Sequence, residues 1–409
     1  MNGPLEGYRV IELASYVAGP GSTRLLADWG AEVIKIESFK GDEYRTNAPI
    51  YKMPTESDLE NPCFDVVAVN KRFLAMDLRT EEGKRIFDEL LAGADVLMTN
   101  TRQASLERLG YDWDTVKERF PHLVYAHMSG YGDKGAERNT PGYDYTCYAA
   151  RGGVTGSLYE RGESPMVPGP AFGDLQASVC LAAGILAALL QRERTGRGDR
   201  VTVSLHGTAV YMMHLIHSAA QYGYLLPASR KEAMNPFNNT YRTADDKWMQ
   251  LAVADFNGRY NHIMKTLGRP DLVDDPRYSN ISHLREAGYH REYIEILEEA
   301  IARHTLDEWA QIFKEADVAF EPLRTSLDVL EDPEVWANDF ARKITYPTGN
   351  ERIVFNNPIH IDSLGVPPFN PSRGIGADTI DVLSELGRSD EEIKDLIAKG
   401  VVVQSDEAR

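Results

Sequence analysis

Tyr8-Arg-Val-Ile-Glu-Leu13 and Ala31-Glu-Val-Ile-Lys-Ile-Glu37 are two short runs rich in β-branched residues, and such runs predict strands. A loop at 14–21 and a short helix at 22–29 separate them, so the unit reads strand, helix, strand with a parallel pair. The alternation recurs downstream, with helices expected at 81–92 and 113–120 and strands at 94–98 and 122–128. The sequence therefore predicts an α/β fold: a Rossmann-like large domain with an open parallel sheet, whose ligands lie at the carboxyl ends of the strands.

A glycine motif inside this first unit raises the question of a dinucleotide site. Gly19-Pro20-Gly21-Ser22-Thr23-Arg24 resembles the nucleotide-binding fingerprint, with Glu37 as the downstream acid. Arg24 stands where the third glycine belongs, and Pro20 has no backbone N–H to offer a phosphate. The motif therefore does not predict nicotinamide binding.

The second informative stretch is Phe172-Gly173-Asp174-Leu175-Gln176-Ala177-Ser178, which runs into an apolar segment at 179–190. It predicts a core helix, since its apolar side chains recur on most of the helical surface. The side chains expected to be buried are Leu175, Val179, Leu181, Ile185, Leu186 and Leu189. Asp174 stands where the helix N-cap belongs. It is either only a cap or a nucleophilic carboxylate, kept ionised by the helix dipole and able to attack an activated acyl group.

The rest of the chain predicts a second, smaller domain and a returning segment. After a helix at 206–223, the texture changes to a hairpin at 238–252 and then to helices at 257–267, 283–304 and 306–315. From about 330 the chain is irregular and Pro-rich, and it closes with two short helices at 376–386 and 389–399. The predicted division is 1–224 for the large α/β domain, 225–325 for a small α+β domain, and 326–409 for a strap that returns to the large domain.

Composition narrows the function classes. The 409 residues are 43% hydrophobic and 26% charged, as in an ordinary globular protein, and the net charge of −18 argues against a nucleic-acid partner. Three unpaired cysteines favour a reducing cytoplasm. The N-terminus shows no signal peptide, and the apolar run at 177–190 is too short for a bilayer, so we expect no membrane partner.

The histidines are the candidate metal ligands, and the basic residues are the candidate phosphate contacts. His214 and His217 share a helical face, but no carboxylate completes a ligand set, so no metal site is predicted. Basic residues near the expected strand ends could hold phosphates together, although each alone is typical of solvated surface. They are Lys71, Arg72, Arg79, Arg102 and Arg108.

Over nearly its whole length the chain resembles the class III CoA-transferases, the formyl-CoA and carnitine CoA-transferase family. Long motifs in a kept order carry the resemblance. They are Leu5-Glu-Gly-Tyr-Arg-Val-Ile-Glu-Leu13, Ala18-Gly19-Pro20, Leu26-Ala-Asp-Trp-Gly-Ala-Glu-Val-Ile-Lys-Ile-Glu37, Asn70-Lys71-Arg72, Ala94-Asp95-Val96, Ser129-Gly130-Tyr131-Gly132, Gly173-Asp174 and Thr195-Gly196-Arg197-Gly198.

The resemblance implies a CoA-transferase that takes coenzyme A as its acyl-CoA substrate and uses no metal. The catalytic Asp of the family falls on Asp174, and the residues beside the acyl site fall on Tyr143 and Asp144. The implied CoA-binding residues are Tyr16, Val17, Ala18, Met76, Arg79, Asn100 and Arg108. The family fold also implies an interlocked, ring-shaped homodimer that the segment 325–370 would close.

Departures from the family pattern bear on the substrate. Ser38 replaces a basic residue of formyl-CoA transferases, Val17 replaces a polar one, and the segment 252–257 lacks their glycine-rich flap, which makes oxalate an unlikely substrate. The chain is most similar to the branch that exchanges CoA between 2-hydroxy acids and 2-enoyl-CoA products. Its cues are Asp144-Tyr-Thr-Cys-Tyr-Ala-Ala-Arg-Gly-Gly-Val-Thr-Gly156, Asn235-Pro-Phe237, Trp336-Ala-Asn-Asp339 and Tyr346-Pro-Thr-Gly-Asn-Glu-Arg352.

Three predictions about the site follow from that branch. The acceptor is a 2-hydroxy acid with an apolar or aromatic side chain, in a pocket lined by Tyr143, Tyr145 and Phe172. Asp144 either faces the C2 hydroxyl or only caps a helix or pairs locally. The alternatives are an acyl-CoA racemase of the same fold and a catalytically silent CoA-binding protein. Racemases carry a His base where this chain has Tyr143, and a tyrosine of ordinary pKa is a poor base at neutral pH.

Overall fold

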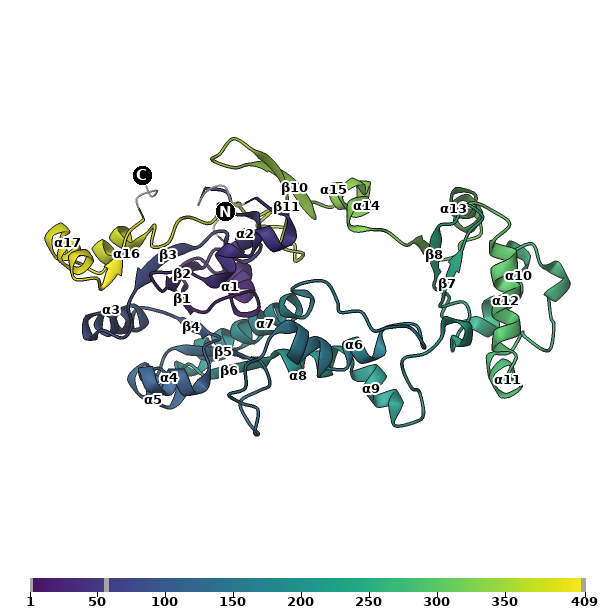
Figure 1. Ribbon diagram of the computed structural model, residues 1–409, viewed down its shortest axis with the longest axis horizontal. Coiled ribbons are helices and arrows are strands. Elements are labelled where there is room, and N and C mark those ends of the chain that lie inside the picture. The colour runs from purple at the N-terminus through teal and green to yellow at the C-terminus, as the bar shows by residue number, and fades with distance from the viewer. Residues whose placement is uncertain (1–2, 55–58, 406–409) are drawn as a thin grey trace. The chain divides into compact units, whose positions relative to one another are not determined.

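The computed structural model describes residues 3–54 and 59–405 and divides into two compact units (Figure 1). The first unit comprises the chain up to Thr155, then Val167–Ser218 and the chain from Trp336 onward, and the second comprises Gly156–Met166 and Ala219–Val335. The second unit contains more of the sequence than the small domain expected at 225–325. One reason is that Arg161 N–H donates to the Ala228 carbonyl at 3.2 Å, which joins the excursion at 156–166 to it.

A seven-stranded sheet forms the centre of the first unit. Its order is β12-β3-β2-β1-β4-β5-β6, and all neighbours are parallel except the edge strand β12. The strands are β1 (Arg9–Leu13), β2 (Glu32–Glu37), β3 (Arg72–Met76), β4 (Val96–Thr99), β5 (Val124–Ser129), β6 (Arg200–Ser204) and β12 (Val402–Val403). The predicted α/β class is confirmed. The strand order reverses between β1 and β4, where doubly wound folds open a ligand crevice.

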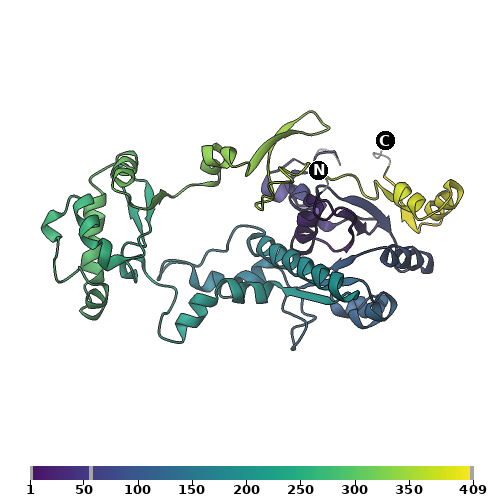
Figure 2. The same cartoon turned by 180° about the vertical axis from the view of Figure 1, so that it is seen from behind.

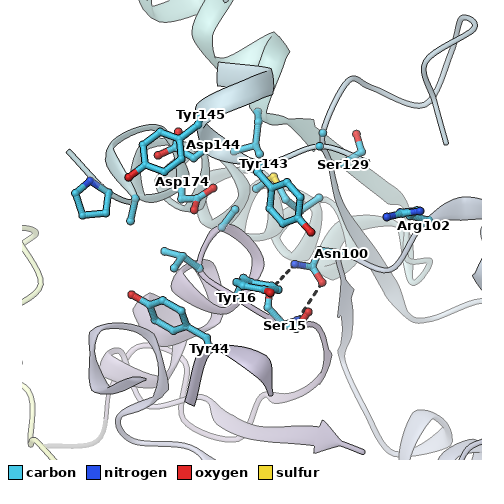
Figure 3. Close-up of a pocket in the computed structure, with 18 of the residues that line it drawn as sticks. Ser15, Tyr16, Tyr44, Asn100, Arg102, Ser129, Tyr143, Asp144, Tyr145 and Asp174 are labelled. Carbon is cyan, nitrogen blue, oxygen red and sulfur yellow. Dashed lines mark hydrogen bonds between the residues drawn. The ribbon is translucent and has the colours of Figure 1, made fainter. Parts of the chain in front are cut away.

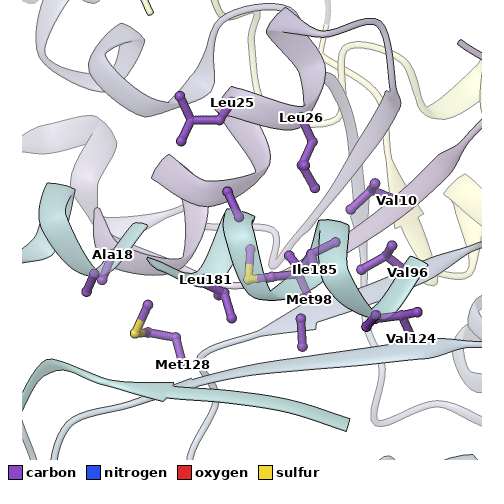
Figure 4. Close-up of a cluster of buried hydrophobic side chains, with 14 of the residues drawn as sticks. Val10, Ala18, Leu25, Leu26, Val96, Met98, Val124, Met128, Leu181 and Ile185 are labelled. Atoms are coloured by element: carbon purple, nitrogen blue, oxygen red, sulfur yellow. The ribbon is translucent and has the colours of Figure 1, made fainter. Parts of the chain in front are cut away.

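Helices cover both faces of this sheet, because both faces are apolar. Successive residues of the central strands point to opposite sides: Val10 and Val96 join a cluster with Leu181 and Ile185 (Figure 4), whereas Ile11 packs into a second cluster. The helices are α1 (Ala18–Asp28), α2 (Pro62–Ala68), α3 (Glu81–Ala92), α4 (Gln103–Leu109), α5 (Trp113–Arg119), α6 (Val154–Ser157), α7 (Phe172–Thr195), α8 (Leu205–Met212), α9 (His214–Ala220), α16 (Thr379–Glu385) and α17 (Asp390–Ala398).

The glycine motif lies inside α1 and serves helix packing. α1 begins at Ala18, four residues before the predicted start, and Pro20 is tolerated in its first turn because the N–H groups there lack helical partners. α1 runs beside α7 (Figures 1 and 2), and the Ser178 hydroxyl donates to the Ala18 carbonyl at 2.8 Å. A Cβ at Gly21 would lie 2.4 Å from Ser178 Oγ, so glycine permits the close approach of the two helices.

A buried ionic cluster joins the carboxyl ends of β1 and β2 to α1. The fully buried Glu12 carboxylate accepts from Lys35 Nζ at 2.7 Å and from Lys71 Nζ at 2.6 Å. Lys71 also donates to the Pro20 carbonyl and to Thr23 Oγ1, both at 2.8 Å. Burial alone would raise the pKa of Glu12, but the two lysines outweigh it and lower that pKa to about 2. Lys71 is therefore a structural ion-pair partner and does not face a phosphate.

α7 is only partly the core helix that its composition predicts. Leu181, Ile185 and Leu189 are buried, but Leu175 and Val179 are 42% and 43% exposed, so the prediction of burial is wrong for these two. Within the described part of the chain, α7 is the one helix long and apolar enough by composition to span a membrane, a test that core helices also pass. Its apolar character serves the sheet on one side and leaves a second side uncovered by this chain.

The second unit pairs a small antiparallel sheet with helices. β7 (Thr240–Arg242), β8 (Trp248–Leu251) and β9 (Phe320–Pro322) form the sheet, and the β7–β8 hairpin confirms the one predicted at 238–252. The helices are α10 (Phe256–Thr266), α11 (Ile281–Glu286), α12 (His290–Ile301), α13 (Leu306–Glu315), α14 (Ser326–Glu331) and α15 (Pro333–Ala337). The single helix predicted at 283–304 is two helices, broken near Gly288, whose φ is +74°.

The segment predicted to be irregular contains a hairpin. β10 (Ala341–Thr345) pairs antiparallel with β11 (Glu351–Phe355) across the Tyr346-Pro-Thr-Gly-Asn350 turn. The Tyr346 hydroxyl donates to buried Asp65 at 2.7 Å, and Arg352 pairs with Glu60 at 2.8 Å. These contacts fasten the returning chain to the first unit.

Removing the Glu12 charge should destabilise the first unit strongly. In Glu12→Gln two buried ammonium groups lose the carboxylate that they share, although Lys35 keeps its pair with Asp42, and breaking a buried ion pair costs about 3–5 kcal/mol of unfolding free energy. Urea denaturation of the full chain measures the change. Glu81→Gln removes an exposed pair with Lys84 and should cost less than about 1 kcal/mol. Equal, small losses in both variants would show that the cluster does not hold the strand ends together.

Candidate functional site

A cavity of about 370 Å³ opens at the carboxyl ends of β1, β4 and β5, beside the reversal of strand order (Figure 3). Its walls are the turn after β1, the loop after β4, the end of β5 and the start of α7. All of its lining residues belong to the first unit. The position is the one at which an open α/β sheet binds ligands.

Hydrogen bonds between loops fix the wall formed by the turn after β1. The side chain of Asn100 accepts from Ser15 N–H at 3.1 Å and donates to the Ser15 carbonyl at 2.7 Å (Figure 3). Tyr16 has a positive φ of 61°, and its N–H donates to Asp42 Oδ1 at 3.0 Å. Asp42 is in turn paired with Lys35 at 2.8 Å, so the buried ionic cluster reaches the pocket wall.

Asp174 is not the N-cap of α7. The helix begins at Phe172, so Asp174 is its third residue, and Ala171 in a left-handed conformation (φ 60°) occupies the cap position. The loop before the helix ends at Ala171, so the helix starts earlier than the pattern predicts. The half-buried Asp174 side chain lines the pocket, so the interpretation of Asp174 as a mere cap is wrong.

Asp144 takes the capping role from a distant segment. It begins a π-helical turn, Asp144–Ala150, and its two carboxylate oxygens lie 3.1 and 3.3 Å from the Gly173 N–H that donates to them. A Cβ at Gly173 would lie 2.4 Å from Asp144 Oδ1, so only glycine allows this approach. The Gly173 N–H is thereby occupied by Asp144 and is not free to bind an oxyanion.

The environment of Asp174 favours its protonated form. Burial is the larger cause and the nearby Asp144 carboxylate is the second, and together they raise the pKa of Asp174 to about 7. Desolvation and the like charge thus act against the helix dipole, which was expected to keep this carboxyl ionised. A carboxylate with such a pKa is more basic than an ordinary one and is poised to react near neutral pH.

Tyrosine rings surround Asp174. Figure 3 shows Tyr16, Tyr44, Tyr143 and Tyr145 around its carboxyl, with Tyr16 and Tyr143 in an edge-on contact at 6.0 Å between ring centres. The Tyr16 hydroxyl donates to Glu43 at 2.7 Å, and this hydrogen bond is the main cause that raises the pKa of Tyr16 to about 12. These rings form an aromatic enclosure around the carboxyl.

The structure brings most of the predicted site residues together. Seven of them line the cavity: Tyr16, Val17, Ala18, Asn100, Tyr143, Asp144 and Asp174. Three do not. Met76 is buried at the end of β3, the exposed Arg79 pairs with Asp77 at 2.8 Å, and Arg108 donates to Ser105 at 2.9 Å. Phe172 is also outside the lining, because it is 50% exposed with its ring against Tyr148.

Several lining residues were not named from the sequence. Arg138 brings positive charge to the cavity, His127 lies on β5, and Tyr44 and Tyr51 come from the 3₁₀ segments Glu43–Thr46 and Ala48–Tyr51. Arg102, which the sequence named as a possible phosphate contact because it follows a strand end, also lines the cavity. Arg72, in contrast, pairs with Glu32 and Glu385 and does not line the cavity. Within residues 3–54 and 59–405, no group of three or more His, Cys, Asp or Glu side chains could hold a metal ion.

The chain is similar to known proteins over nearly its whole length. The model of CoA-transferase family III matches residues 5–379. The chain is 43% identical to a cinnamoyl-CoA:phenyllactate CoA-transferase of Clostridium sporogenes, over 95% of each chain. It is 40% identical to an (R)-2-hydroxy-4-methylpentanoate CoA-transferase of Clostridioides difficile, over 97% of this chain and 99% of that one. A CAIB/BAIF family protein from Brucella suis has the same fold, with a TM-score of 0.77 and 27% identity over 94% of this chain and 100% of the other.

Stability should depend on pH through Asp174. A carboxyl whose pKa is raised from 3.8 to about 7 on folding stabilises the folded state below its ordinary pKa and loses this contribution as pH rises through about 7. Asp174→Asn cannot ionise, so it should become more stable than the parent between about pH 4 and 8, by about 1–3 kcal/mol. Thermal melts across this range measure the difference, with the exposed Asp362→Asn as control. A difference that does not change with pH would contradict the raised pKa.

Proposed function

The chain belongs to CoA-transferase family III, and we propose that it moves CoA from an acyl-CoA, in particular a 2-enoyl-CoA, to a free 2-hydroxy acid. The proposal rests on one observation above all: a carboxyl of raised pKa, Asp174, faces a cavity at the switch point of a doubly wound sheet. The donor is the CoA thioester of one carboxylic acid, and the product is the CoA thioester of another, so the bond that is broken and the bond that is formed are alike. The exchange therefore needs no ATP.

Asp174 would act as the nucleophile. Its carboxylate attacks the thioester carbonyl and releases CoA thiolate, leaving a mixed anhydride between Asp174 and the donor acid. The thiolate then attacks the aspartyl carbonyl and expels the donor acid, which gives an aspartyl-CoA thioester. The carboxylate of the incoming 2-hydroxy acid attacks that thioester and releases the thiolate, which leaves an anhydride between Asp174 and the acceptor. The thiolate then attacks the acyl carbon of the acceptor and expels the Asp174 carboxylate. Each cycle thus regenerates the Asp174 carboxylate.

The neighbours of Asp174 support this chemistry in two ways. The Asp144 charge helps raise the pKa of Asp174, so the ionised carboxylate is a stronger nucleophile than an ordinary Asp. Burial among tyrosine rings limits access of water, and anhydride and thioester intermediates both hydrolyse when water reaches them. Burial and capping of α7 by Asp144 thus serve the reacting group without touching the thioester.

CoA enters this site as a substrate, and the cavity residues fit its parts. Tyr16, Val17, Ala18 and Asn100 form the wall that the family resemblance assigns to CoA, and the guanidinium of Arg102 lies farther from Asp174 on the same side (Figure 3). An arginine beyond the thioester suits a phosphate of the cofactor end. Arg79 and Arg108 remain proposed contacts for portions of CoA that extend outside the cavity, whereas Met76, with 3% of its surface exposed, is not available for such a contact.

The acyl side suits an apolar or aromatic side chain. Tyr44, Tyr143 and Tyr145 present ring faces and edges beside Asp174, and aromatic pairs contribute about 0.5–1.5 kcal/mol beyond the area that they bury. A carboxylate has about four acceptor sites, so Asp144 keeps capacity for the C2 hydroxyl of a substrate beside the N–H that it caps. The names of the two relatives, one for an aryl and one for a branched alkyl acid, support the same class.

We also propose that the protein is an interlocked homodimer. Apolar side chains on α7, α8 and α9 are exposed in the described part of the chain, and exposed apolar surface of this kind marks protein interfaces. They are Leu175, Val179, Leu190, Val210, Tyr211, Met212 and Leu215. The ring-shaped dimer implied by the family resemblance would cover these residues with a second copy of the chain. The cysteine usage favours a cytoplasmic enzyme.

Activity assays test the proposed reaction. With an aryl 2-enoyl-CoA as donor, phenyllactate and 2-hydroxyisocaproate should have higher kcat/KM than lactate, oxalate or carnitine, because apolar rings surround Asp174. Asp174→Ala should lose at least about 10³-fold in rate, and the exposed Asp362→Ala should lose none. The product acyl-CoA is read by mass spectrometry. Near-parental turnover by Asp174→Ala would end the mechanism, and a preference for oxalate or carnitine would overturn the substrate class.

Mixing experiments test the dimer. Tagged and untagged dimers incubated under native conditions should not form mixed dimers, because two closed rings cannot separate without unfolding. Denaturation followed by refolding of the mixture should produce them, which controls for the ability of the two versions to pair. A monomer in light scattering, or rapid formation of mixed dimers without denaturant, would contradict interlocking.

A further inference from the structure

Two arginines line the cavity without a partner from the described chain. Arg102 lies in the loop after β4, and Arg138 lies in the loop 131–141 after β5. Neither guanidinium makes an ion pair or a hydrogen bond with any residue in the ranges 3–54 and 59–405. Glu137, adjacent to Arg138, instead pairs with Arg151 at 3.9 Å. In a chain with a net charge of −18, two unpaired arginines in one cavity are available to an anionic ligand.

A hydrogen bond between the two loops brings these arginines to one edge of the cavity. Asn139 Oδ1 accepts from the Ala104 N–H at 3.3 Å, which ties the loop 131–141 to the start of α4. Arg138 directly precedes Asn139, and Arg102 lies two residues before Ala104. The backbones that carry the two guanidinium groups are therefore held close together.

The residue after Arg102 supplies a hydrogen-bond acceptor to the same cavity. Gln103 also lines it, and its Nε2 donates to Glu107 at 3.3 Å. Its Oε1 is buried and has no hydrogen-bond donor among the residues that the structure describes. Exchanging the two amide atoms would set Oε1 against the Glu107 carboxylate, where both atoms could only accept. Buried polar atoms nearly always have a partner, so we expect a ligand to donate to Oε1.

We propose that Arg102 and Arg138 bind the diphosphate of CoA and that Gln103 accepts an amide N–H of its pantetheine arm. This assignment rests on the proposed transfer of CoA and names the residues that recognise the carrier. Seen from the thioester, the amide N–H groups of CoA come first and the diphosphate is its first anionic group. The arginine side chain presents a planar set of N–H donors that matches phosphate oxygens. The three side chains thus select a CoA thioester over a thioester without the diphosphate.

The acceptor acid is the other anion of the proposed reaction, and its carboxylate fits this position less well. That carboxylate must reach the acyl group on Asp174. Arg102 lies farther from Asp174 than Asn100 does, on the side of the wall assigned to CoA (Figure 3). Two arginines also exceed what one carboxylate needs, because one guanidinium can hold both of its oxygens.

Calorimetric titration of the full chain with CoA, dephospho-CoA and ADP tests the arginines without any turnover. All three ligands contain the diphosphate. Arg102→Gln and Arg138→Gln should each weaken the binding of all three by about 10-fold, because charge-assisted hydrogen bonds are lost. Arg303→Gln removes an exposed arginine of the second unit and should change none of the three affinities. Unchanged affinity for CoA in both cavity variants would overturn the assignment. A loss for CoA but not for dephospho-CoA would also overturn it, because the arginines would then bind the 3′-phosphate.

The same titrations test Gln103 with a near-isosteric variant. Gln103→Met should weaken CoA and dephospho-CoA by about 10-fold and leave ADP unchanged, because ADP lacks the pantetheine arm and a buried amide N–H would lose its acceptor. Glu107→Leu breaks the contact between Gln103 and Glu107 but keeps Oε1, so it should leave all three affinities unchanged. An equal loss for ADP and CoA in Gln103→Met, or no loss for either, would contradict the role of Oε1.

Kinetics separate this proposal from the proposed function. In the double variant Arg102→Gln/Arg138→Gln the KM for acyl-CoA should rise, while kcat should change by less than about 2-fold because Asp174 is untouched. A rise only in the KM for the acceptor acid would overturn the assignment and place the arginines at the acceptor carboxylate. If the chain bound CoA through these residues but transferred it to no acid, the proposed function would fail and the subsite would stand. Transfer with an unchanged KM for acyl-CoA in the double variant would refute the subsite alone.

Discussion

The buried carboxylate of Glu12 holds the rest of the structure in register. Two lysines from different segments converge on it, and a buried charge of this kind persists only when its partners are complete. Lys71 carries the cluster to the first turn of α1, and Lys35 carries it to Asp42, which binds the N–H of Tyr16. The ends of β1 and β2, the start of α1 and one wall of the cavity are therefore fixed by one set of interactions. A strained turn with a positive φ at Tyr16 can persist because its surroundings are this rigid.

The reacting group depends on a second contact between distant parts of the chain. Gly21 allows α7 to approach α1, and Gly173 allows Asp144 to reach the first turn of α7. The small residues at these two positions bring the Asp174 carboxyl into a site where it is half-buried and lies near a second carboxylate, Asp144. Both conditions raise its pKa, which costs stability at neutral pH and gives a more basic nucleophile. The uncovered apolar side of α7, at Leu175 and Val179, shows that the same helix has a further surface to bury.

Local patterns predicted the parallel sheet, the β7–β8 hairpin and the neighbourhood of Asp174, because strand alternation, turn residues and helix periodicity are short-range signals. The order of the motifs predicted the family, and the resemblance to that family named most of the site residues. What the sequence did not predict depends on contacts between distant residues. Asp144 caps α7 from 29 positions away, His127 meets Thr101 from 26 positions away, and β12 joins the sheet edge beside β3. No periodicity encodes such meetings. The sequence also could not predict which face of α7 is exposed. An apolar residue is predicted to be buried whether this chain or a second copy covers it.

In the proposed mechanism, Asp174 exchanges its own carboxylate oxygen in every cycle. The donor acid should leave with an oxygen from Asp174, and the acceptor acid should leave one of its carboxylate oxygens behind. The most direct measurement is therefore a turnover with an acceptor 2-hydroxy acid labelled with oxygen-18 in its carboxylate, followed by digestion and mass spectrometry of the peptide that contains Asp174. The account predicts that heavy oxygen enters that peptide and accumulates with turnover. Continued transfer of CoA with no heavy oxygen in Asp174 would contradict it.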